Sequence, residues 1–116
     1  MNRPIKFRAW DEIKKRFSEW GYLYGDVARF VGLENPSFIS QQFTGLLDKN
    51  GKELYEGDVI SENEGRNMLI VWQQSKARFI GKYIGIRDGW RMLSKRNERR
   101  YQTIGDKFSN PELLNQ

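Results

Sequence analysis

The chain alternates apolar and polar residues along most of its length, which is the pattern of β-strands with one buried face. In the segment 5–10, Ile5, Phe7 and Ala9 share one face of an extended backbone, and the residues between them share the other. The segment 67–73 contains the longest apolar run, so we expect it to form the most buried strand. The whole pattern predicts strands at residues 5–10, 17–24, 38–43, 59–62, 67–73, 77–87, 90–93 and 101–105.

Turn-forming residues separate these strands. Asn50 and Gly51 supply the positive φ angles that a tight turn requires, and Asp48 can accept hydrogen bonds from the backbone that follows it. Asp88 and Gly89 form a second strong hairpin signal. Short strands joined by tight turns are typical of a small β-barrel or roll, and no stretch of the sequence fits a long helix.

The end of the chain predicts one helical turn. Asn110 can cap free backbone amides, and Pro111 suits the first helical position, where a missing N–H is not needed. Only a short helix can follow, so Leu113 or Leu114 has to pack on the body of the protein to hold it. The predicted fold class is therefore all-β with a minor α component.

Length and composition allow one hydrophobic core, because the 116 residues include 38% apolar residues and 16 aromatic ones (4 Trp, 5 Tyr, 7 Phe). The absence of cysteine is compatible with a reducing compartment. The longest apolar run has five residues, far below the roughly 20 that span a bilayer. We expect no signal peptide, no membrane partner and a cytoplasmic location.

The net charge of +5 lies entirely in the second half of the chain. Residues 1–58 contain nine basic and nine acidic residues, whereas residues 59–116 contain eleven and six. The segment 76–100 holds nine bases against two acids, and such a stripe can attract nucleic acid or an acidic protein surface. The alternative is that these bases only aid solubility and protect sheet edges. The candidate nucleic-acid-binding residues are Lys76, Arg78, Arg91, Lys95, Arg96, Arg99 and Arg100.

Aromatic residues are interleaved with these bases. If the rings of Phe79, Tyr83 and Trp90 faced outward, bases of a single nucleic-acid strand could stack on them. A period of two, however, places Phe79 and Tyr83 on the face opposite to the neighbouring bases. A small barrel also needs large apolar side chains inside, so we expect these three rings and that of Tyr101 to lie in the core.

The sequence contains no histidine and no cysteine, which removes thiol nucleophiles, imidazole bases, serine triads and the usual zinc ligands. Glu12 and Lys14 have the spacing of half a metal-dependent nuclease motif, but no acid precedes Asp11 to complete it. The acidic segment 53–58 lacks the spacing of a calcium loop. We therefore expect no catalytic residues, no metal and no cofactor, and we do not expect an enzyme.

Three segments carry a family resemblance. Residues 5–11 read Ile-Lys-Phe-Arg-Ala-Trp-Asp, residues 42–58 read Gln-Phe-Thr-Gly-Leu-Leu-Asp-Lys-Asn-Gly-Lys-Glu-Leu-Tyr-Glu-Gly-Asp, and residues 104–114 read Ile-Gly-Asp-Lys-Phe-Ser-Asn-Pro-Glu-Leu-Leu. In this order they closely resemble the motifs of the YopX family, small proteins encoded by phages and prophages, mostly of Gram-positive bacteria. The third segment departs from the family pattern where it has Asp106, Phe108 and Ser109 in place of Asn, Tyr and Glu. These changes preserve the turn chemistry and an aromatic ring.

The resemblance implies an SH3-like barrel in the second half of the chain, in agreement with the strand-and-turn pattern. It implies no established reaction and no catalytic residue. We expect one domain over residues 1–116: an N-terminal strand arm (1–43), an SH3-like small barrel or roll (44–108) and a short C-terminal helical turn (109–116).

The expected function is that of a non-enzymatic, phage- or prophage-encoded binding module. Its partner would be a host or phage protein, which it would inhibit or assist. The alternative is binding of DNA or RNA through the basic stretch 76–100. An N-terminal arm that can cover the edge of a neighbouring barrel also predicts a homo-oligomer.

Overall fold

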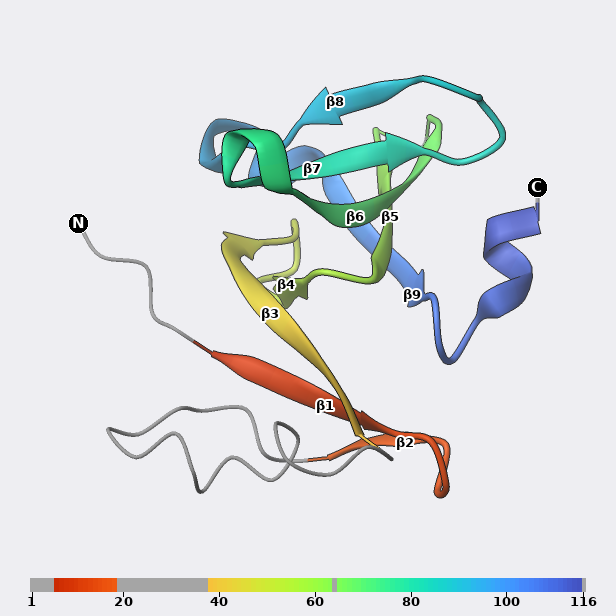
Figure 1. Ribbon diagram of the computed structural model, residues 1–116. Helices are drawn as coiled ribbons and strands as arrows, with labels where there is room; N and C mark the ends of the chain where they lie inside the picture. The colour runs from red at the N-terminus through yellow and green to blue at the C-terminus, as the bar shows by residue number, and fades with distance from the viewer. Residues whose placement is uncertain (1–5, 19–37, 64, 116) are drawn as a thin grey trace. The chain divides into compact units, whose positions relative to one another are not determined.

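The computed structural model of the chain describes residues 6–18, 38–63 and 65–115 (Figure 1). The chain divides into two compact units, Met1–Phe43 and Thr44–Gln116. Strands make up most of the described residues, and the helical segments among them are short 3₁₀ helices. The expected fold class, all-β with a minor helical component, is confirmed.

The first unit contains a small antiparallel sheet. Its middle strand, β1 (Phe7–Asp11), pairs with β2 (Arg16–Ser18) on one side and with the first part of β3 (Phe38–Leu47) on the other. Trp10 and Phe17 are cross-strand partners, and their rings meet edge to face with 5.0 Å between centroids. Most of the strand predicted at 17–24 lies outside the described residues.

The second unit is built on a five-stranded antiparallel sheet with the strand order β8-β7-β6-β5-β9. β4 (Glu53–Tyr55) precedes this sheet in the sequence and pairs with β3. The sequence pattern did not predict this strand. The arrangement is the SH3-like roll that we expected. Its strands are β5 (Asp58–Glu62), β6 (Asn67–Gln73), β7 (Arg78–Tyr83), β8 (Trp90–Met92) and β9 (Tyr101–Asp106).

Two connections differ from the sequence prediction. β7 ends at Tyr83 rather than at residue 87, and the amide of Tyr83 donates a 3.0 Å hydrogen bond to the carbonyl of Gly89. Asp88 and Gly89 therefore end a longer loop instead of forming a two-residue hairpin. The basic stretch expected as a loop is the 3₁₀ helix η3 (Lys95–Arg100), whose start is held by a 3.1 Å hydrogen bond from the Ser94 amide to the Tyr101 hydroxyl.

The core of the second unit lies on one face of the sheet. Met68 and Ile70 alternate with more exposed residues along β6, so this strand is buried on one face only. The expectation that β6 is the most buried strand was wrong, because β5 is covered on both faces: Val59 and its neighbour Ile60 are both fully buried. The core cluster consists of Leu54, Ile60, Met68, Ile70, Phe79 and Tyr101.

The C-terminal 3₁₀ helix, η4 (Pro111–Asn115), packs on β9 at Gly105. A Cβ atom on Gly105 would lie 2.5 Å from Asn110 Oδ1 and 2.8 Å from Leu113 Cδ1, so a larger residue would displace the ends of these two side chains. The expected packing of Leu113 is confirmed. The side chain of Asn110 was expected to cap the helix that follows it. Its oxygen instead accepts a hydrogen bond from the amide of Asp106 at the end of β9.

The substitution Gly105→Ala tests the packing of η4. The added methyl group would push the side chains of Asn110 and Leu113 away from β9, so we expect the free energy of unfolding to fall by about 1–3 kcal/mol and residues after Asp106 to become more sensitive to proteolysis. Urea denaturation and limited proteolysis measure both effects. Lys107→Ala, at an exposed neighbouring position, is the control and should change stability by less than about 0.5 kcal/mol. An unchanged Gly105→Ala protein would show that η4 does not pack on β9 in solution.

Candidate functional site

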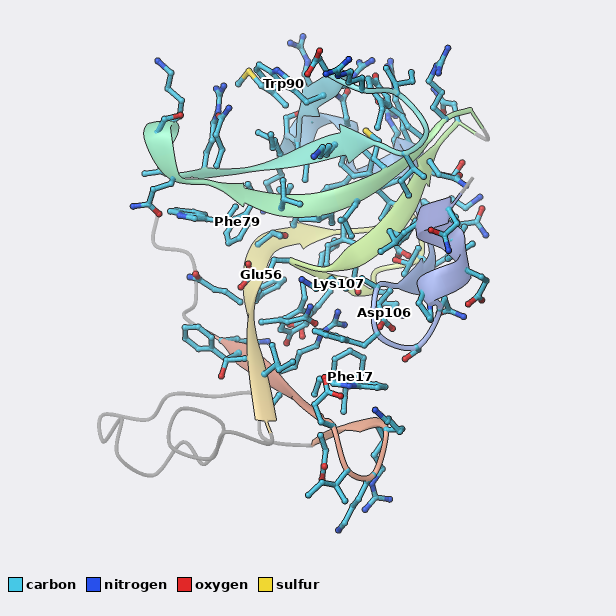
Figure 2. All side chains as sticks on the ribbon, turned by 45° about the vertical axis from the view of Figure 1, so that its right-hand side comes forward. Phe17, Glu56, Phe79, Trp90, Asp106 and Lys107 are labelled. Carbon is cyan, nitrogen blue, oxygen red and sulfur yellow. The ribbon has the colours of Figure 1, made fainter. Side chains whose placement is uncertain are left out.

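One face of the β7–β8 pair points away from the core. The register pairs Ile80 with Met92 and Lys82 with Trp90, and alternate residues of a strand share a face. Arg78, Ile80 and Lys82 of β7 therefore lie on the same side as Trp90 and Met92 of β8. We call these five residues the β8 face. Figure 2 shows Trp90 on this side of the sheet and Phe79 on the other.

The side chain of Trp90 is 46% exposed and that of Met92 is 55% exposed. The expectation that Trp90 belongs to the core was wrong, because the pairing of β8 with β7 turns it to the outer face. Phe79 and Tyr101 are buried, and Tyr83 is partly buried against the core cluster, so the expectation is confirmed for these three rings.

The guanidinium of Arg78 makes a cation–π contact with the indole of Trp90. It lies 5.2 Å from the centre of the ring, and its Nε donates a 2.7 Å hydrogen bond to the side chain of Gln73. Ile80 lies between them on the same face of β7 and is only 7% exposed, although it is on the outer side of the sheet. The Arg78–Trp90 pair thus lies over Ile80, and its cation–π contact favours one orientation of the indole.

Arg91 projects from the opposite side of β8, because its cross-strand partner is Gly81. Its Nε lies 3.3 Å from Glu62 Oε1 at the end of β5. A hydrogen bond with the Tyr83 side chain, together with the charge of Glu62, raises the pKa of the Arg91 guanidinium. Arg91 is therefore paired with Glu62 on the other side of β8 and is not part of the β8 face.

The other candidate bases lie on short 3₁₀ helices. Lys76 is exposed on η2 (Gln74–Lys76), the connection between β6 and β7. η3 lies at the same end of the sheet as η2. The reason is that η2 leads into the start of β7, η3 follows the end of β8, and these two strand ends are neighbours. The exposed bases of η3 are Lys95, Arg96, Arg99 and Arg100.

Arg99 and Arg100 line a polar cavity of about 270 Å³. The other residues that line it are Lys49, Asn63 and Gln102. We call these five residues the cationic pocket. Sequence reasoning found the two arginines from the density of positive charge but missed the other three, because they come from the turns after β3 and β5 and from β9.

Asp48 places Lys49 beside this cavity. Its Oδ1 accepts hydrogen bonds from the amides of Asn50 (2.8 Å) and Lys52 (3.0 Å), as the sequence predicted, and its Oδ2 accepts one from the Thr103 hydroxyl (2.9 Å). Burial acts to raise the pKa of Asp48, but the hydrogen bonds from the turn amides and from Thr103 outweigh it and hold the pKa below its ordinary value.

The acidic residues that were weighed as metal ligands have local partners. Asp58 Oδ2 accepts the amide of Tyr55 at 2.9 Å, and the Tyr55 hydroxyl donates to Glu53 at 3.3 Å. Glu12 pairs with Lys15 at 3.1 Å in an exposed turn. Within residues 6–18, 38–63 and 65–115, no group of three or more acidic side chains is placed to hold a metal ion. No helix in this described part of the chain is long and apolar enough to cross a membrane.

Comparison with known proteins identifies a matching family and a solved structure with a similar fold. A family model described as YopX protein matches residues 6–115. The fold is similar to the crystal structure of protein EF1440 from Enterococcus faecalis, with a TM-score of 0.71 and 22% sequence identity over 97% of this chain and 99% of that chain. No curated protein matches the chain. At 22% identity, the likeness to EF1440 shows a shared fold.

The substitution Asp48→Asn tests the role of this carboxylate. Because its pKa is lowered in the folded protein, the ionised form stabilises the fold above the ordinary aspartate pKa of about 4, and this contribution is lost as the pH falls through the lowered value. We expect the variant to be less stable than the parent by about 1–3 kcal/mol at pH 7.

The difference in stability should begin to narrow as the pH falls below about 4, and it should be smallest below the lowered pKa, where the carboxyl of the folded parent is protonated. Urea denaturation at both pH values measures it. Asp88→Asn, at an exposed position, is the control and should change stability little at either pH. A stability difference that is the same at both pH values, or absent at pH 7, would contradict this role.

Proposed function

The chain belongs to the YopX family, and we propose that it is a non-enzymatic binding module whose β8 face binds an acidic surface of a partner protein. The observation that carries the proposal is the exposure of Trp90 and Met92 on an edge strand, between basic residues. The partner is a host or phage protein, and the module is encoded by a phage or prophage and acts in the bacterial cytoplasm.

The residue types of the β8 face are those enriched at protein interfaces. Tryptophan, methionine and arginine are over-represented there, and a well-packed tryptophan is often the residue that contributes most to affinity. The contact with Arg78 favours one orientation of the Trp90 ring, which lowers the entropy that binding costs. Trp90 is therefore suited to be the central anchor of an interface.

The charge around this anchor indicates an acidic partner. Arg78 and Lys82 lie on the face itself, and Arg87 is exposed in the loop that leads to β8. A negative surface on the partner would complement these charges and speed association. In the described part of the chain, β8 pairs with β7 alone, so its second edge is also available for an extended segment of the partner.

Nucleic acid is the second candidate, because Trp90 shares its face with Arg78 and Lys82, which is a geometry in which a base could stack. Sheets that bind single strands, however, usually offer several exposed rings along one face. On the β8 face the described residues offer one ring, since Phe79 and Tyr83 point to the core side. We therefore favour the protein partner.

Site-specific photo-crosslinking tests the proposal. A photoreactive amino acid at position 90, in cells of an infected or lysogenic host, should crosslink one partner protein, and the product should survive nuclease treatment. The matched control is position 104, because Ile104 is 38% exposed on β9, the opposite edge strand of the sheet. The substitution Trp90→Ala should reduce capture of that protein at least tenfold, which corresponds to about 1.4 kcal/mol, whereas Ile104→Ala should not.

The alternative outcomes are distinguishable. Loss of the crosslinked product after nuclease treatment would identify nucleic acid as the partner and overturn the proposal, and so would equal crosslinking at positions 90 and 104. A product with the mass of two copies of this chain, together with a dimer in light scattering, would show that the β8 face serves self-association instead.

A further inference from the structure

The cationic pocket is separate from the β8 face and has its own chemistry. Its five lining residues are three with cationic side chains, Lys49, Arg99 and Arg100, and two with amide side chains, Asn63 and Gln102. Its volume of about 270 Å³ is close to the lower end of ligand sites, which begin near about 300 Å³. All five side chains carry N–H groups that can donate hydrogen bonds.

We propose that the cationic pocket binds a phosphate group. Guanidinium groups match the oxygen geometry of phosphate with paired hydrogen bonds, and a lysine adds a mobile positive charge. A terminal phosphate offers three acceptor oxygens to these donors and inorganic phosphate offers four, whereas a carboxylate offers only two. A dianion also balances the charge of three lining cations better than a single negative charge does.

The walls of the pocket are joined by backbone hydrogen bonds. The amide of Lys49 donates to the carbonyl of Tyr101 at 2.8 Å, and the amide of Asn63 donates to the carbonyl of Arg100 at 2.9 Å. The turn after β3, the turn after β5 and the junction of η3 with β9 are thereby held at one place. The lining side chains start from positioned backbone, which lowers the entropy lost on binding.

Three of the acidic residues next to the pocket in sequence have partners of their own. Asp48, Glu62 and Glu98 directly precede Lys49, Asn63 and Arg99. Glu98 accepts the amide of Leu47 at 2.9 Å, Glu62 lies 3.3 Å from Arg91, and Asp48 accepts the amides of its own turn. None of these three carboxylates lines the cavity. The described wall of the cavity therefore contains cationic and amide residues and no carboxylate.

The phosphate has two chemical sources that the experiment separates. One is the terminal phosphate of a small ligand such as a mononucleotide, which is the dianion that the three cations favour. The other is the backbone phosphate of a single-stranded nucleic acid, which is a monoanion with two free oxygens. The probes are inorganic phosphate, adenosine monophosphate and a short oligonucleotide without a terminal phosphate. Titration calorimetry gives the affinities, and NMR of the ¹⁵N-labelled protein locates binding through the signals of Asn63 and Gln102.

Charge-neutralising variants on one helix provide matched controls. Arg99→Gln and Arg100→Gln remove cations that line the cavity, whereas Lys95→Gln and Arg96→Gln remove exposed cations of η3 that do not line it. We expect each pocket variant to weaken binding of the active probe at least about tenfold, and each control to weaken it less than about twofold. All four positions are exposed, so circular dichroism should show that the variants are folded.

Each outcome of these binding measurements has one interpretation. Binding of adenosine monophosphate that depends on Arg99 and Arg100 supports a terminal phosphate, and oligonucleotide binding with the same dependence supports a backbone phosphate. Failure of all three probes to bind, or equal losses in pocket and control variants, overturns the proposal. Trp90→Ala should leave phosphate binding unchanged, so this proposal and the one for the β8 face succeed or fail separately.

Discussion

The hydrogen bonds of the Asp48 carboxylate organise the second unit around the end of β3. One oxygen closes the turn after β3 and the other reaches Thr103 on β9, a strand more than fifty residues later in the chain. Beside them, the amide of Lys49 donates to Tyr101, whose buried ring belongs to the core and whose hydroxyl accepts the amide of Ser94. The positions of the turn, of the start of η3 and of the cationic pocket all follow from this connection.

The basic stretch between residues 76 and 100 is one feature in the sequence but has three roles in the structure. Arg78 stacks on Trp90 and shapes the outer face of the sheet. Arg91 points the other way and neutralises Glu62. Arg99 and Arg100 line a cavity with residues from distant turns. Strand pairing produces this division, because neighbouring residues of a strand point to opposite faces.

Both proposed sites lie at the margins of the core rather than inside it. The β8 face is on an edge strand, where the sheet ends and a large ring stays partly exposed. The cationic pocket is formed where three connections meet. A small roll has an interior filled by its own side chains, so binding groups have to be carried on edges and connections. The two sites use different residues and can act on different ligands.

The sequence alone determined the local features. It placed a strand at 67–73, the Asp48 turn and the packing of Leu113, because alternation, turn residues and short-range hydrogen bonds depend on neighbours in the chain. The tertiary structure decided that Trp90 is exposed and that Lys49 joins Arg99. Alternation divides the residues of a strand between two faces but does not show which face packs on the core. Residues far apart in the chain come together only through strand pairing.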